Sequence, residues 1–484
     1  MVGYELEQPI DITKPVTSIG KLAARFATGH WAVLSGSPTL TQGHTGWNSS
    51  GVKTGITSRT GQPKLLKVVP SANSLEQIEL QSFSTNMLTK ALNGIIGLWV
   101  YVENQPGYQV GGTLTGSISI SMSTNASSYL NGVVAAFNTH QVREGWNFLV
   151  FRMRNHSAYT SGSGITEDHP YGVNAFANGT GADGNIVSTD IAKLKIYWDN
   201  MSGSTMYFDS IWTGFSSKAQ YVLGCDQGPL LEEVAIPIFE SYGWVGYAAF
   251  SFNAVDTGTS NSTVQADMTS PGSSANAILS RLYAKGWDVI SHSVTHPKLG
   301  GMSDEGNIQY QAQMSQQWLL SNKFFRGNEF YASPQSSSSR LSELVIKTLG
   351  FKLQRHARKT NIAITPWGID NPHHVGGIGW GSNAAIAYSS VTGGVTSSTL
   401  GQQTLAKMKR TIDVMEVYGD TCIVWWHGIT TTGDTGSGED LTGDNLLITA
   451  SAITQALAYL RQRELAGGLT VARGFTDMWY GTNL

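Results

Sequence analysis

The chain has 484 residues, of which 40% are hydrophobic, so it can form two or more folded domains and is not a disordered chain. Only 13% of the residues are charged, and a net charge of −3 at pH 7 gives no electrostatic basis for binding nucleic acid or an anionic membrane. The two cysteines, Cys225 and Cys422, exclude a disulfide framework, and their apolar surroundings favour buried free thiols.

The start of the chain, MVGYELEQPIDITKP, shows no basic region followed by an apolar stretch, so no signal peptide is visible. Either the protein leaves the cell by another route, such as inside a virus particle, or the sequence begins at an artificial boundary. No apolar run approaches the ~18 residues of a membrane-spanning helix, so we expect no membrane span. The expected location is a virion tail or the extracellular space.

Residues 1–217 contain several segments in which apolar and polar residues alternate, the period of a half-buried strand. Clusters of Gly, Asn, Ser and Pro separate these segments, and no helical period of comparable length occurs. This rhythm predicts a β-sandwich of the jelly-roll type, acting as a carbohydrate-binding or spacer domain. The alternating segments are residues 97–103, 117–123, 146–154, 191–199 and 206–214.

Residues 218–484 have a different rhythm, in which apolar strands alternate with amphipathic helices. The strand YVLGC is followed by a helical segment, and the helical stripe around Leu279 and Leu282 ends at Gly286, directly before the strand WDVIS. Later, a stripe that includes Met408 precedes the strand CIVWW. Such alternation predicts a parallel sheet, either open or closed into a barrel.

Ionisable residues follow three of these strands. Asp226 follows YVLGC, His292 and His296 follow WDVIS, and His427 follows CIVWW. Because the carboxyl ends of parallel strands meet at one edge of a sheet, we expect these side chains to share a pocket. The alternative is that each histidine is an ordinary polar residue at the end of a strand. That alternative explains one such histidine well, but it explains the pattern at all three strands less well.

Histidines at positions i and i+4 suit a divalent transition metal, because one helical turn brings both rings to the same face. A metal lowers the pKa of a bound water, and a nearby carboxylate and a further histidine can act as base and acid. The parts for amide or ester hydrolysis are therefore present. A Ser-His-Asp site fits less well, because no GxSxG sequence lies at a strand–helix turn.

With these motifs in place, residues 218–484 resemble the polysaccharide deacetylase family, also called carbohydrate esterase family 4 or the NodB homology domain. Four blocks carry the resemblance in the family's order. They are VLGCDQGPLLEEVAIPIFESYGWVGYAAFSF, the histidine box SHSVTH, YASPQSSSSRLSELVIKTLGF and IVWWHGI. The resemblance implies a distorted (β/α) barrel that removes acetyl groups from a polysaccharide.

The resemblance also implies roles for single residues. Asp226 would be the general base, and His427 the acid that protonates the leaving group. His292 and His296 would bind a divalent metal, which is usually zinc in this family. The backbone N–H of Gln335 would help to hold the oxyanion.

This sequence departs from the family pattern at several positions. The family's metal-binding Asp is Gln227, a poor zinc ligand, and the usual Arg of the third block is Ala332. Arg355 or Arg358 corresponds to the Arg that orients the base. Three outcomes stay open: weak metal binding, direct ligation of the metal by Asp226, or loss of activity. The pair at 373–374 is interpreted as a solvated or substrate-facing loop element.

A sandwich fused to such a barrel, without a visible signal peptide, resembles phage tail spikes or fibres that modify bacterial surface glycans. The expected partner is an acetylated polysaccharide of a capsule, O-antigen or exopolysaccharide, and a homotrimer is the expected assembly. Whether the acetyl group sits on nitrogen or oxygen stays open. The alternative is a glycan-binding adhesin whose deacetylase-like domain is catalytically impaired.

Overall fold

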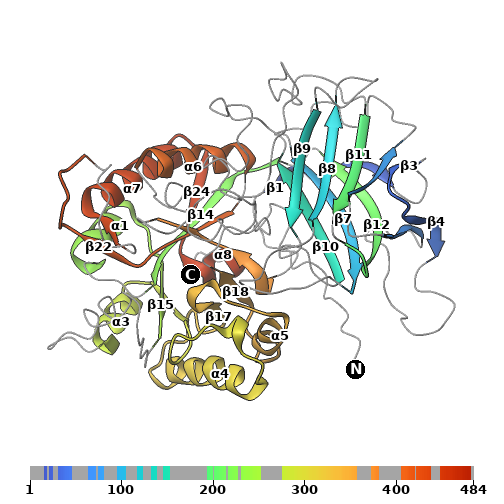
Figure 1. Cartoon of the computed structure of the whole chain (residues 1–484). Coiled ribbons are helices and arrows are strands. Elements are labelled where there is room, and N and C mark those ends of the chain that lie inside the picture. Colours follow the sequence, from blue (N-terminus) through green and yellow to red (C-terminus); the bar gives the residue numbers. More distant parts are fainter. Residues whose placement is uncertain are drawn as a thin grey trace. The chain divides into compact units, whose positions relative to one another are not determined.

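The chain divides into two compact units, and the main division falls between Ser217 and Lys218. Both units are drawn in Figure 1, and each is described by itself. The computed structural model describes residues 16–18, 21–25, 31–45, 64–71, 75–80, 95–104, 117–123, 132–138, 145–152, 193–199, 201–213, 216–226, 231–251, 275–356, 372–380, 405–419, 421–437 and 447–480.

The first unit consists of antiparallel strands in two main sheets, and each of the five predicted strands is present. One sheet has the order β10 (Gly145–Arg152), β7 (Ile95–Glu103), β12 (Thr205–Thr213), β5 (Lys64–Val69) and β4 (Thr39–Thr45), and β2 (Lys21–Arg25) also pairs with β12. The other has the order β3 (Trp31–Ser35), β6 (Glu76–Leu80), β11 (Lys193–Asp199), β8 (Ser117–Ser123) and β9 (Gly132–Asn138). A short β1 (Val16–Ser18) pairs with β13 (Ser216–Ser217).

The apolar residues at alternate positions of these strands are buried, as period-two sequences require, and on β8 the intervening Ser119 and Ser121 are buried as well. Val100 and Val102 on β7 and Ile118 and Ile120 on β8 have no exposed surface. The two sheets meet through aromatic rings, since the ring centroids of Trp198 on β11 and Phe208 on β12 lie 6.4 Å apart. The jelly-roll connectivity of this unit stays a prediction.

The second unit contains a parallel sheet that almost closes into a barrel, which confirms the barrel prediction. The segment from Val375 to Gly379 connects the two ends of the sheet, because its first half pairs with β18 and its second half with β21, and the ladder is interrupted only at Gly377. The sheet order is β19 (Val375–Gly376), β18 (Leu353–His356), β17 (Phe330–Ala332), β16 (Asp288–Ser291), β15 (Tyr247–Phe250), β14 (Ala219–Asp226), β21 (Thr421–Trp426) and β20 (Ile378–Gly379), and β24 (Leu469–Ala472) pairs with β14.

Helices connect the strands of this unit (Figure 1), and their ends follow local chemistry. The α4 helix begins after Asp304, whose side chain accepts from the Gly306 N–H, and α5 begins with a reciprocal Ser339–Ser342 capping box. The helices are η2 (Leu231–Ala235), α1 (Ile236–Tyr242), α3 (Ala275–Ala284), η3 (Leu299–Gly301), α4 (Glu305–Ser321), η4 (Pro334–Ser336), α5 (Arg340–Thr348), η5 (Pro372–His374), α6 (Leu405–Tyr418), α7 (Ala450–Leu465) and α8 (Gly474–Tyr480). Two further strands, β22 (Gly428–Thr430) and β23 (Leu447–Thr449), pair in parallel.

None of the helices in the described part of the chain is long and apolar enough to cross a membrane. Cys225 and Cys422, on β14 and β21, are buried free thiols. Burial raises the pKa of Cys225. This placement agrees with the prediction for both cysteines.

Apolar side chains at alternate positions of the barrel strands form a buried core, to which β20 contributes none. A single cluster includes Val222, Tyr247, Ile290 and Trp425 together with Phe475, Met478 and Trp479 of α8. The Tyr247 ring lies over Gly224, where an added Cβ would be 2.3 Å from the ring, so only glycine fits there. Side chains of the short helix α8 are therefore part of the hydrophobic core of the barrel.

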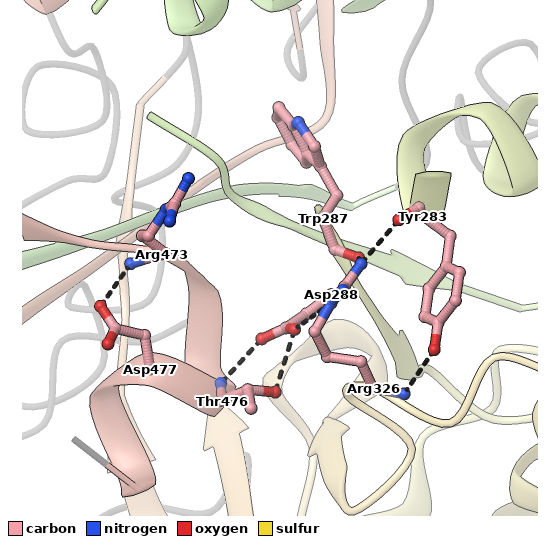
Figure 2. A network of polar contacts seen from close by, with 7 residues as sticks. All are labelled: Tyr283, Trp287, Asp288, Arg326, Arg473, Thr476 and Asp477. Carbon is pink, nitrogen blue, oxygen red and sulfur yellow. Dashed lines mark hydrogen bonds and ion pairs between the residues drawn. The ribbon is translucent and has the colours of Figure 1, made fainter. Parts of the chain in front are cut away.

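A polar network joins α8 to the first residue of β16 (Figure 2). The buried Asp288 carboxylate accepts from the Thr476 N–H at 2.7 Å and from the Thr476 hydroxyl at 2.9 Å. Arg326 lies 3.3 Å from the same carboxylate, and its Nη2 donates to the carbonyls of Tyr283 and Trp287. Despite these partners, burial raises the pKa of Asp288 to about 6. The network lies at the amino end of β16, away from the strand end that His292 follows.

The raised pKa of Asp288 predicts that the second unit loses stability as the pH rises. Between pH 3.8 and about 6 the unfolded chain releases this proton and the folded chain keeps it, so the free energy of unfolding falls. A gap of about two pH units corresponds to on the order of 3 kcal/mol. Asp288→Asn should remove this part of the pH dependence, measured by urea unfolding from pH 4 to 7. Asp477→Asn, on the same helix, is the control, and equal pH slopes for wild type and Asp288→Asn would contradict the prediction.

Candidate active site

A buried ion pair lies at the carboxyl end of the barrel strands. Asp226 is the last residue of β14, and its Oδ1 accepts a hydrogen bond from Nη2 of Arg355 on β18. Arg355 has no exposed surface, and its guanidinium lies 5.7 Å from the ring centroid of Tyr247 and 5.9 Å from that of Trp425. Among the described residues, only Nη2 of the guanidinium finds a hydrogen-bond partner, while Nε and Nη1 are buried without one, so the carboxylate and the aromatic rings offset the loss of water only in part.

This ion pair keeps Asp226 ionised. Burial alone would raise the pKa of its carboxyl, but the charge and hydrogen bond of Arg355, helped by His292 and His427, outweigh burial and lower the pKa below its ordinary value. At neutral pH the site therefore holds a carboxylate fixed in position by a guanidinium.

The two histidines of the SHSVTH motif lie side by side. His292 directly follows β16, His296 lies on the next loop, and their ring centroids are 4.9 Å apart at 67°. Nδ1 of His292 lies 2.8 Å from the carbonyl oxygen of Ala332 on β17. That contact assigns the ring proton to Nδ1, so that Nε2 carries the free lone pair.

These imidazoles have the properties of metal ligands. Burial lowers the pKa of His292 to about 3, so the ring is neutral at physiological pH, as ligation requires. Among the residues that the structure describes, however, no three His, Cys, Asp or Glu side chains are grouped closely enough to hold a metal ion. The pair thus fits a divalent transition metal as two of its ligands, and Asp226 as a third ligand stays a prediction.

His427 reaches the same region from β21. Its ring packs edge-on against Trp425 at 5.0 Å between centroids and remains partly exposed. Surrounding protein lowers the pKa of His427 to about 4, while the charge of nearby Asp226 opposes that shift. Asp226 interacts electrostatically with His292 and His427, and the His296 ring lies beside His292, so these side chains are near one another; that they form one active site stays a prediction.

Gln335 lies beside the histidine loop. It is in η4, it has a left-handed φ of 51°, and its side chain is exposed. Its Nε2 donates to the carbonyl oxygen of His296 at 3.4 Å. The structure thus brings Gln335 to the site, and its role in holding an oxyanion stays a prediction.

Of the two candidate arginines, Arg355 contacts Asp226, while Arg358 and also Gln227 lie outside the described residues. Ala332 on β17 is directly opposite Arg355 on β18, so a small side chain lies next to the arginine. His373 is 7% exposed, so the interpretation of the pair at 373–374 as solvated is wrong for His373, and its carbonyl oxygen lies 3.4 Å from Nε2 of His356.

Two aromatic rings that flank Arg355, those of Tyr247 and Trp425, are not among the predicted site residues. Trp425 lies on β21 two positions before His427, which directly follows that strand, and Tyr247 is the first residue of β15. The period-two rule places Trp425 and His427 on one face, and this signal could have indicated Trp425 as part of the site.

The fold and this site define a nearly closed parallel (β/α) barrel with a histidine-rich centre at its strand ends. Residues 222–354 match the sequence model of the polysaccharide deacetylase family, which confirms the resemblance for that segment. The match includes Asp226, His292 and His296 and ends directly before Arg355. No protein of curated function matches the chain in sequence.

Several solved structures are similar to this chain. The Xyl-CE4 domain of a multidomain xylanase from the hindgut metagenome of Trinervitermes trinervoides is 16% identical, over 55% of this chain and 91% of that one, with a TM-score of 0.31. A family 4 acetyl xylan esterase from Clostridium thermocellum, in complex with a cobalt ion, is 13% identical over 54% and 90%, with a TM-score of 0.31. A CE4 family pseudoenzyme from Bacillus anthracis is 10% identical over 54% and 66%, with a TM-score of 0.30.

Proposed function

We propose that the second unit belongs to the polysaccharide deacetylase family and hydrolyses acetyl groups from a bacterial surface polysaccharide with the help of a divalent metal. The observation that carries the proposal is the meeting of four sequence-distant groups at one barrel edge: the His292–His296 pair, Asp226, Arg355 and His427. A virion-tail location and a trimeric assembly remain predictions that the described residues do not address.

His292 and His296 would hold the metal, and zinc is the ion that the family resemblance implies. The contact of His292 with the Ala332 carbonyl supports this, because metal-ligating histidines commonly donate their second ring nitrogen to an oxygen. A divalent metal bound there would polarise the acetyl carbonyl and lower the pKa of water.

Asp226 is the general base in this proposal. Its lowered pKa keeps it ionised at neutral pH, the protonation state in which it can accept a proton from the attacking water, and Arg355 holds its orientation. The Gln335 N–H stabilises the developing oxyanion. His427, neutral in the resting protein, can protonate the leaving group only after it has received a proton.

The proposal predicts release of acetate from at least one acetylated bacterial polysaccharide. Acetate is measured over a panel of capsular, O-antigen and exopolysaccharide substrates, with N-acetyl and O-acetyl examples. Chelation or His292→Ala should lower the rate by about 100-fold, because even outer partners of metal ligands contribute about 10–100-fold. Re-addition of Zn²⁺ should restore the chelated wild type but not the variant. Full activity of metal-free protein would contradict the role of the metal.

A second candidate function is glycan binding by a protein whose barrel is inactive. It is favoured by the lack of a three-ligand group in the described residues and by aromatic side chains on one face of the first unit. There the partly exposed Trp99 packs against Phe148 at 4.7 Å, and the partly exposed Tyr101 against Tyr207 at 6.1 Å between ring centroids. Aromatic rings offer apolar faces with polar edges, which suits sugars. This function predicts glycan binding that Trp99→Ala weakens and His292→Ala leaves unchanged, without acetate release.

A further inference from the structure

The loop between the two histidines has an unfavourable backbone conformation. Ser293 has a φ of 73° and His296 a φ of 61°, both in the left-handed region that residues with a Cβ avoid. Each such residue costs on the order of 1–3 kcal/mol unless its surroundings impose it. Something outside the loop must therefore hold it, because relaxation of either residue would turn the His296 ring away from His292.

Gln311 of helix α4 makes the contacts that can do this. Its Oε1 accepts from the Val294 N–H and from the Thr295 N–H, both at 3.0 Å, and its Nε2 donates to the Thr295 hydroxyl at 2.9 Å. Both backbone donors lie between the two histidines. The side chain is 8% exposed, so water cannot readily replace it.

The position of α4 fixes this carboxamide. One helical turn after Gln311, Ser315 is also buried, and the Ser291 hydroxyl on β16 donates to it at 2.7 Å. Ile308, Ala312 and Leu319 bury the same side of the helix. The buried side of α4 is thus apolar except at Gln311 and Ser315. These two polar side chains face the histidine loop and β16 and form hydrogen bonds with them.

Loss of the Gln311 oxygen would leave the buried Val294 N–H and the partly buried Thr295 N–H without their acceptor. Val294 is 2% exposed, and an unsatisfied buried donor costs about 1–3 kcal/mol. The internal bond from the His296 N–H to the Ser293 hydroxyl at 3.0 Å satisfies neither group. The loop would then rearrange so that these N–H groups reach other acceptors, and Ser293 and His296 would leave the left-handed conformation.

We propose that Gln311 is a positioning residue, which holds residues 293–296 in the left-handed conformation that sets the His296 ring against His292 and thereby tunes affinity for a divalent metal. The metal part of this inference rests on the proposed function. The part that concerns the loop does not, because it follows from the hydrogen bonds and backbone angles of the loop itself.

Two variants separate the hydrogen bonds from the shape of the side chain. Gln311→Met keeps the volume and removes both acceptor and donor. Gln311→Glu keeps the acceptor for both N–H groups, and the Thr295 hydroxyl can rotate to donate to it. Gln317→Met is the matched control, because Gln317 lies on the exposed side of the same helix. Thr295→Val removes a single contact and provides a milder variant if Gln311→Met fails to fold.

Two measurements on the full-length protein test the inference. In Co²⁺ titrations followed by visible absorption, Gln311→Met should bind about 10–100-fold more weakly than wild type, the usual effect of losing an outer partner, while Gln311→Glu and Gln317→Met stay within about threefold. In hydrogen exchange without metal, the Val294 and Thr295 amides should exchange faster in Gln311→Met alone.

Unchanged Co²⁺ affinity together with unchanged exchange in Gln311→Met would overturn the inference. If wild type binds no Co²⁺, the proposed metal site is refuted, and the exchange data alone then decide whether Gln311 holds the loop. If both Gln311 variants weaken Co²⁺ binding equally, the acceptor oxygen is not the cause, and the inference is also wrong.

Discussion

Replacement of Arg355 by methionine is expected to lower the free energy of unfolding of the second unit by about 3–5 kcal/mol, the usual result of removing one partner of a buried ion pair. Asp226 would remain buried with its carboxylate uncompensated. The Tyr247 and Trp425 rings that now flank the guanidinium would face an apolar chain, which they tolerate. The loss therefore arises from the carboxylate and not from poorer packing.

The same substitution should reverse the effect of acid on stability. In wild type the pKa of Asp226 is lowered, so its contribution is present above the ordinary pKa of 3.8 and is lost as the pH falls further. Without Arg355, burial is the largest remaining influence, and it raises the pKa. The contribution of Asp226 would then be lost as the pH rises through the new value.

A double-mutant cycle isolates this pair. Urea unfolding at pH 4 to 7 is measured for wild type, Arg355→Met, Asp226→Asn and the double variant. The double variant should recover much of the stability that Arg355→Met loses, because a neutral amide is far less costly to bury than an unpaired carboxylate. Additive losses in the double variant would show that Arg355 acts mainly through packing.

The part of the site that follows strand ends could be predicted from the sequence. Asp226, His292 and His427 each follow an apolar strand, and parallel topology brings such positions together. The choice between Arg355 and Arg358 could not be predicted, because it depends on the register of β18 against β17, in which Arg355 is opposite Ala332. No local pattern in the sequence encodes that register.

The helix α8 and the role of Gln311 could not be predicted from the sequence either, for a different reason. The α8 helix has seven residues, too short for a clear helical period, and it is stabilised by the barrel core and by Asp288, which lies far away in sequence. In the sequence, Gln311 is one of several glutamines of the α4 segment, and nothing distinguishes it from the others. Its contact with the histidine loop depends on how α4 packs against β16. In the first unit, alternation predicts the strands, but their order in each sheet depends on pairings between distant segments.

Asp226→Asn is expected to lower the rate of acetate release by about 10²–10⁴-fold, the range usual for loss of a general base. The asparagine oxygen can still accept the Arg355 hydrogen bond, so the site should keep its shape, which near-ultraviolet circular dichroism checks. Asp288→Asn is the matched control, because Asp288 is a buried carboxylate of the same barrel at the amino end of its strand.

The affinity for Co²⁺ distinguishes the two roles that the sequence leaves open for Asp226. As a general base held by Arg355, Asp226 contributes to proton transfer, so Asp226→Asn should lose activity and bind Co²⁺ nearly as wild type does. As a direct ligand, Asp226 would be part of the metal site, and the variant would lose affinity and activity together. The Arg355 ion pair, which already engages the Asp226 carboxylate, favours the first result. Asp226 would instead be a direct metal ligand if Asp226→Asn showed a large loss of Co²⁺ affinity. Recovery of its activity at saturating metal would lead to the same conclusion.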